Sequence, residues 1–224
     1  ACVFRLICRK VFRRNPLCRM VRDSPEAYSG CQTYRKIHLE IVGMPNETEY
    51  TNRRPDSMAK LRKMLGRADD PQIISLMRMI DTQSKRTLAA WAADCAADRY
   101  LPIYELACPG DARLRDLIAS VRDCLRGDLP MADLRARLRE ARTVAKDAES
   151  SGAAAQAAAR AVTTACAVLS TPSNALGFTF YGAAAAAYSI AGEDASSAEY
   201  DQLGAAELQK LADSLKAAMI PDEP

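Results

Sequence analysis

Three carboxylates are the residues best placed by type and spacing to do chemistry. Asp94 and Asp98 stand four residues apart in a segment with helical patterning, and Glu105 follows shortly after them. Side chains four residues apart share one face of a helix. Such a pair could hold Mg²⁺ or share a proton at a raised pKa. The same carboxylates could instead pair with basic neighbours such as Arg86 or Arg99. The sequence therefore offers one candidate polar site but assigns it no catalytic role.

Other familiar patterns of catalysis and cofactor binding are missing. The only histidine is His38, so residues 58–224 lack the imidazole that Ser-His-Asp, Cys-His and histidine-ligated metal sites need. Neither the phosphate-binding pattern G-x-x-x-x-G-K-[ST] nor G-x-G-x-x-G occurs. We therefore expect no cofactor and no metal in this body.

The eight cysteines fall into two groups of four. They are Cys2, Cys8, Cys18, Cys31, Cys95, Cys108, Cys124 and Cys166. The first group could bind zinc, although its spacing is irregular and no pair reads C-x-x-C. The second group falls in helical patterns, where free cysteine behaves as a small apolar residue. Reduced thiols, and an Arg5 that interrupts the first apolar stretch, predict a cytoplasmic protein.

Charge divides the chain into a basic extension and an acidic body. Residues 1–67 hold 15 of the 31 basic and 6 of the 28 acidic side chains, a net charge of +9. The remaining 16 basic and 22 acidic side chains give residues 68–224 a net charge of −6. The extension could attract nucleic acid or anionic lipid, or it could be a solvated leader. The acidic body suits a basic protein partner. No stretch reaches the roughly 18–20 apolar residues of a membrane span.

The first 57 residues do not have the texture of a folded unit. Pro16, Pro25, Pro45 and Pro55 interrupt every candidate helix, and only residues 37–42 alternate like a short strand. We therefore predict two parts, an irregular extension or misassigned leader over residues 1–57 and a helical domain over residues 58–224.

Helical periodicity begins near Asp70 and continues almost to the C-terminus. Asp70-Pro71 is a helix start, Gly127 is a helix stop, and Pro102 predicts a kink or break. Leu114, with the apolar residues that follow it at helical spacing, forms the clearest amphipathic stripe. The first predicted helix begins near Asp70. The later ones cover about residues 84–99, 103–107, 111–127, 130–148, 153–170, 174–190 and 196–219.

The apolar helix over residues 174–190 belongs at the centre of a bundle, because it has no polar face to turn to solvent. Loops of about two to six residues favour antiparallel neighbours. The predicted fold class is all-α, a single bundle of about six or seven mostly antiparallel helices. Trp91 is predicted to anchor the core.

One helix in this bundle carries an arginine series that could meet an acidic partner or nucleic acid. It consists of Arg135, Arg137, Arg139 and Arg142. Asp133 and Glu140 interleave with the series, which favours a solvated helix face.

Five stretches of the helical body form a recognisable series. They are Leu88-Ala89-Ala90-Trp91-Ala92-Ala93-Asp94-Cys95-Ala96, Leu101-Pro102-Ile103-Tyr104-Glu105, Pro109-Gly110-Asp111-Ala112-Arg113, residues 156–162 and residues 176–184. In these stretches the chain resembles a bacterial family of helical immunity proteins assigned to polymorphic toxin systems. The resemblance covers about residues 69–219 and none of the extension. Family members often have histidines in the fourth and fifth helices, whereas this chain reads Glu140-Ala141-Arg142 and Thr163-Thr164-Ala165-Cys166 there.

The resemblance implies a non-enzymatic protein that neutralises a cognate protein toxin by binding it. Two other interpretations stay open. One is a carboxylate- or metal-dependent enzyme, or a nucleic-acid-associated protein that uses Asp94, Asp98, Glu105 and the basic extension. The other is a structural bundle that oligomerises through any exposed apolar part of the helix from Leu176 to Ala187.

Overall fold

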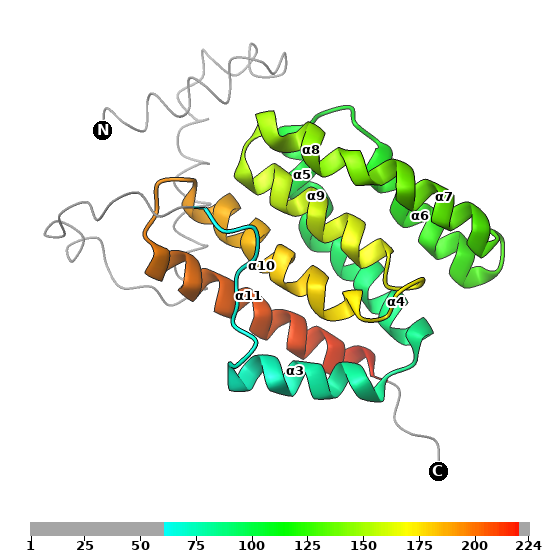
Figure 1. Ribbon diagram of the computed structural model, residues 1–224, viewed down its shortest axis with the longest axis horizontal. Helices are drawn as coiled ribbons and strands as arrows, with labels where there is room; N and C mark the ends of the chain where they lie inside the picture. Colours follow the sequence, from blue (N-terminus) through cyan, green and yellow to red (C-terminus); the bar gives the residue numbers. More distant parts are fainter. Residues whose placement is uncertain (1–60, 220–224) are drawn as a thin grey trace, which may run out of the picture. The chain divides into compact units, whose positions relative to one another are not determined.

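Residues 61–219 are described by a computed structural model, and within them the chain is all-α with no strand (Figure 1). The elements α4, η3 and α5 follow one another without interruption, as do α7, η4, α8 and η5. The predicted all-α class is confirmed. The elements are α3 (Pro71–Thr82), α4 (Lys85–Cys95), the π-helix η3 (Ala96–Tyr100), α5 (Leu101–Ala107), α6 (Arg113–Arg126), α7 (Met131–Glu140), the 3₁₀ helix η4 (Ala141–Thr143), α8 (Val144–Asp147), the 3₁₀ helix η5 (Ala148–Ser151), α9 (Ala153–Cys166), α10 (Asn174–Ala191) and α11 (Ser197–Ala218).

Side chains and a glycine set several helix boundaries where the sequence placed them, although α9 ends at Cys166, before the predicted residue 170. The Asp70 carboxylate accepts a hydrogen bond from the backbone N–H of Gln72 at 2.8 Å, so α3 starts as predicted. Ser84 and Ser196 cap α4 and α11 in the same way. Gly127 ends α6 in the left-handed region at φ +93°, where residues with a side chain are strained.

The segment before Pro102 contains a π-helical turn where the sequence predicted a kink or a break. Pro102 has no N–H to donate to the carbonyl of Asp98, four residues earlier. Leu101 donates instead to the carbonyl of Ala96, five residues back, and the extra residue in that turn lets the chain continue directly into α5. Asp98 therefore lies in η3, whereas Asp94 lies in α4.

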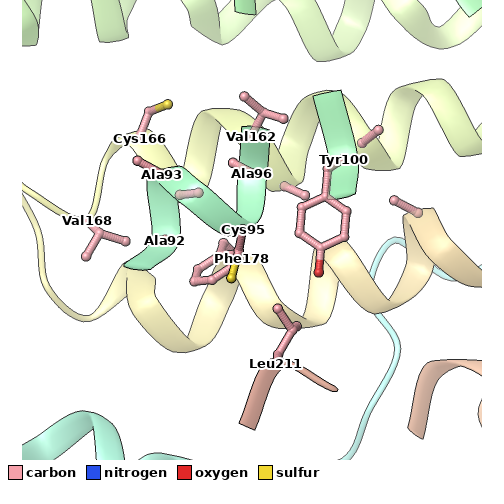
Figure 2. Close-up of a cluster of buried hydrophobic side chains, with 14 of the residues drawn as sticks. Ala92, Ala93, Cys95, Ala96, Tyr100, Val162, Cys166, Val168, Phe178 and Leu211 are labelled. Atoms are coloured by element: carbon pink, nitrogen blue, oxygen red, sulfur yellow. The ribbon is translucent and has the colours of Figure 1, made fainter. Parts of the chain in front are cut away.

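Helix α10 occupies the centre of the bundle, as its apolar sequence predicts. It packs between α9 and α11 (Figure 1), and nine of its residues are buried, mostly alanine. Small residues allow close approach of neighbouring backbones. Phe178 and Trp91 meet edge to face with ring centroids 4.9 Å apart. Figure 2 shows Phe178 and Tyr100 among the small side chains of α4 and η3. Trp91 is thus a core residue, as predicted.

The predicted helix over residues 130–148 is less regular than its pattern. Its apolar stripe is buried at Leu134, Leu138, Ala141 and Ala148, but η4 interrupts the α-helix and η5 ends it. Arg137 leaves the predicted arginine face and donates to the Ser120 hydroxyl of α6 at 2.5 Å.

The predictions for His38, the first four cysteines, the strand over residues 37–42 and the boundary at residue 57 lie outside the described residues. They stay predictions. Among the helices of residues 61–219, none combines the length and hydropathy that crossing a membrane requires.

Candidate functional site

The three candidate carboxylates line one side of the bundle, where two of them pair with arginines of α6. Asp94 accepts from Arg122 at 2.8 Å, and Glu105 accepts from Arg115 at 2.8 Å. Asp98 is exposed and forms no hydrogen bond or ion pair with another described residue. The three carboxylates are thus separate groups along a helix face.

A shallow groove of about 210 Å³ lies beside these carboxylates, between the α4–α5 rod and α6. Its apolar lining is Ala97, Leu101, Ile118 and Ala119, and its charged rim is Arg115, Arg122, Asp123 and Arg126. Within residues 61–219, no three His, Cys, Asp or Glu side chains come together as a metal ion would need. A Mg²⁺ site built on the candidate carboxylates has no support in this geometry.

Asp94 does form a surface ion pair with a basic residue, but Arg86 and Arg99, the partners named from the sequence, are wrong. Arg86 donates to the backbone carbonyl of Leu125, and Arg99 turns inward to Glu207 of α11. Contacts between helices that are far apart in sequence determine these pairings. Residue spacing along one helix does not contain that information.

The main buried polar cluster consists of Arg99, Tyr100 and Glu207, and the sequence interpretation missed it. Glu207 is only 4% exposed and accepts a forked pair of hydrogen bonds from Arg99, at 2.7 Å from Nε and 2.5 Å from Nη2. The Tyr100 hydroxyl donates to the same carboxylate at 3.0 Å. A signal was available, because Glu207 stands four residues from both Leu203 and Leu211 on the buried stripe of α11. A carboxylate in such a stripe requires a partner.

The pKa shifts in this cluster favour a protonated Tyr100 hydroxyl and a charged Arg99 guanidinium. Burial, and then the charge of Glu207, raise the pKa of the Tyr100 hydroxyl well above its ordinary value, so it stays a donor. The hydrogen bonds to Glu207 raise the pKa of Arg99, so it stays a cation. The cluster therefore ties η3 to α11 at neutral pH.

A second set of polar contacts joins α4, which continues directly into η3, to α11. The Trp91 indole N–H donates to the Ser214 hydroxyl at 2.8 Å, and that hydroxyl donates to the Leu211 carbonyl at 2.9 Å. Cys95 lies 3.5 Å from the same oxygen, and burial raises the pKa of its thiol. A thiol held in its neutral form is a poor nucleophile, so these contacts position helices rather than provide chemistry.

A third network links α5, the turn before α6 and α8. The Tyr104 hydroxyl donates to Asp111 at 2.7 Å, and Arg113 pairs with Asp111 at 2.6 Å and with Asp147 at 2.7 Å. Hydrogen bonds from Arg113 hold the pKa of Asp111 well below its ordinary value. These residues fix the turn over residues 108–112.

This network predicts a loss of stability in acid. Because the pKa of Asp111 is lowered from 3.8 on folding, its contribution is complete above about pH 4 and is lost as the pH falls toward the lowered pKa. Arg113 is half exposed, so screening limits the effect to about 1 kcal/mol. Urea unfolding at about pH 6 and about pH 3 should show a smaller pH dependence for Asp111→Asn than for the unmodified chain. Equal pH dependence in both proteins would contradict this role.

Part of these networks falls in the stretches that carry the family resemblance. Trp91, Tyr104, Asp111 and Arg113 all take part, and a family model described as "Imm-5 like putative immunity protein" matches residues 78–213. The chain belongs to this family. The match runs from within α3 to within α11. No curated protein and no solved structure matches the chain.

Membership in the Imm-5-like family explains why the motif residues are those of packing. Trp91 and Tyr104 are buried; the Trp91 indole donates to Ser214 of α11, and the Tyr104 hydroxyl donates to Asp111 in the turn before α6. Where the chain departs from the histidines of the resemblance, Arg142 is exposed and Thr163 and Thr164 are partly exposed on α9.

Proposed function

We propose that this chain is an immunity protein that neutralises a cognate protein toxin by direct association. The observation that carries the proposal is the family match, which spans residues 78–213 and therefore most of the helical body. An association mechanism needs a rigid surface and no reacting group.

The state of the buried polar groups supports a binding role. Within residues 61–219, every buried side-chain nitrogen and oxygen has a hydrogen-bond partner. Glu207, Arg99 and Tyr100 satisfy one another, and Asp111 is shared by Tyr104 and Arg113. Groups committed in this way rigidify the scaffold. A surface held rigid before binding loses less entropy on association.

The proposal predicts that a toxin gene lies beside the gene for this chain, and the experiment is to purify this full chain with the toxin domain of that gene. We expect a complex with a dissociation constant of about 1 nM or tighter, and toxin activity that falls in proportion to the chain added until the two are equimolar. Toxin recovered after denaturing separation should be chemically unchanged and active on refolding. Inactivation by a small fraction of an equivalent would indicate an enzyme instead, and absence of a complex would refute the proposal.

We further propose that this association takes place in the bacterial cytoplasm. Supporting this location, the cysteines of the described body are free thiols, as expected in a reducing compartment. The same purification, by sizing the free chain, tests whether it forms a homo-oligomer.

A further inference from the structure

The rod made by α7, η4 and α8 carries four cations along one side. Arg135, Arg139, Arg142 and Lys146 are all exposed and follow one another in steps of four, three and four residues. This spacing keeps side chains on one face of a helix. At a rise of 1.5 Å per residue the set extends about 16 Å along the rod. We call these four residues the basic stripe.

The carboxylates of the same rod fall on a different side. Asp133, Glu140 and Asp147 repeat every seven residues, which places them on a row of their own. The acidic and basic residues that alternate in the sequence therefore lie on two different sides of the helical segment. On the acidic side, Asp147 is paired with Arg113 of α6.

The basic stripe differs from those arginines of the body that are held in ion pairs. In the described residues no carboxylate pairs with a cation of the stripe, whereas ion pairs hold Arg62, Arg67, Arg99, Arg113, Arg115, Arg122 and Arg126. Arg78, Arg86, Arg137 and Arg160 also form no ion pair with a described residue, but these four lie on four different helices. Four neighbouring cations without an ion-pair partner leave a positive field along their side of this segment.

We propose that the basic stripe is a docking surface for an acidic face of the protein toxin, an inference that rests on the proposed function. Charge complementarity identifies the partner's chemistry: a row of Asp or Glu side chains about 16 Å long. Although the net charge of −6 over residues 68–224 suits a basic partner, exposed charges act over a screening length of about 8 Å. At that range the stripe determines the field at its own surface.

Nucleic acid fits this surface less well than an acidic protein does. Residues 131–151 contain no aromatic side chain on which a base could stack. A polyanion longer than the stripe would also run onto a body whose net charge is negative. A compact acidic protein face ends where the stripe ends.

The test compares two charge-matched variants of the full chain. The stripe variant carries Arg135→Glu, Arg139→Glu, Arg142→Glu and Lys146→Glu. The control variant carries Lys63→Glu, Arg78→Glu, Lys85→Glu and Lys210→Glu, four exposed residues outside the rod. Both change the net charge equally, and circular dichroism and urea unfolding establish that both are folded.

The first arm uses a photoreactive 20-residue oligoglutamate and a 20-base-pair DNA duplex, with cross-linked peptides located by mass spectrometry. We expect oligoglutamate to label residues 131–149, with labelling about tenfold lower in the stripe variant and unchanged in the control. Labelling of this segment by DNA in preference to oligoglutamate would overturn the choice of a protein partner. Labelling by oligoglutamate only elsewhere would overturn the surface itself.

The second arm measures association with the toxin domain from the neighbouring gene. The stripe variant should associate at least about tenfold more slowly than the control, with a weaker dependence on salt, because steering by charge acts on the association rate. Equal rates for the two variants would refute the stripe and leave the proposed function intact. A toxin that binds none of the proteins would refute the proposed function, whatever oligoglutamate does.

Discussion

Glu207→Ala should lower the free energy of unfolding by about 3–5 kcal/mol, because it breaks the buried ion pair between η3 and α11 from one side. The substitution leaves the Arg99 guanidinium without its carboxylate and the buried Tyr100 hydroxyl without an acceptor. A buried donor without an acceptor adds its own desolvation cost. Urea unfolding followed by circular dichroism measures the change.

The matched control for this prediction is Asp201→Ala. Asp201 also lies on α11 and also pairs with an arginine, Arg62, but both side chains are about half exposed. Exposed pairs contribute about 0.2–1 kcal/mol, so this variant should be near neutral. Glu207→Gln should fall between the two, since an amide oxygen can still accept from Tyr100. Similar costs for the alanine variants at positions 207 and 201 would show that the buried pair has no special role.

Local chemistry explains the part of the fold that the sequence predicted well. Capping by Asp70 and termination at Gly127 depend on a few adjacent residues, and both are observed. The central position of α10 follows from composition alone, because a helix without a polar face must be covered on all sides. The immunity-family resemblance rested on the order of packing residues, and the family match over residues 78–213 confirms it.

The side-chain partners that could not be predicted from the sequence depend on contacts between different helices. Arg99 was one candidate partner for Asp94 or Asp98, but the π-turn and the approach of α11 direct it to Glu207. Arg137 was grouped with its neighbours on an arginine face, but it donates to Ser120. In both cases a long side chain could reach several acceptors. Tertiary packing determines which acceptor is used, and residue spacing along the sequence does not reveal it.

The two glycines of α10 should respond to alanine in opposite directions. In a helix interior, glycine costs about 0.5–1 kcal/mol relative to alanine. At Gly177 an added Cβ would meet only the Thr164 methyl group, at an ordinary 3.6 Å. Gly177→Ala should therefore raise the free energy of unfolding by up to about 1 kcal/mol. This variant is the control for the next one.

Gly182→Ala should lower the free energy of unfolding by about 1–3 kcal/mol despite the same gain in helix propensity. The added Cβ would overlap the Tyr100 ring, lying 2.7 Å from Cε2 and closer still to Cζ and the hydroxyl. Since that hydroxyl donates to Glu207, moving the ring also weakens the polar cluster.

A double-mutant cycle with Tyr100→Leu separates this mechanism from a general intolerance of α10. Leucine lacks the ring atoms that approach Gly182, so in that background Gly182→Ala should cost much less than it does alone. Additive costs in the cycle would mean that Tyr100 is not the obstacle. A glycine that is required only while Tyr100 stands opposite it would tie the small residue of α10 to the buried carboxylate of α11 through one aromatic ring. The close packing of this bundle and its polar interior would then be parts of a single constraint.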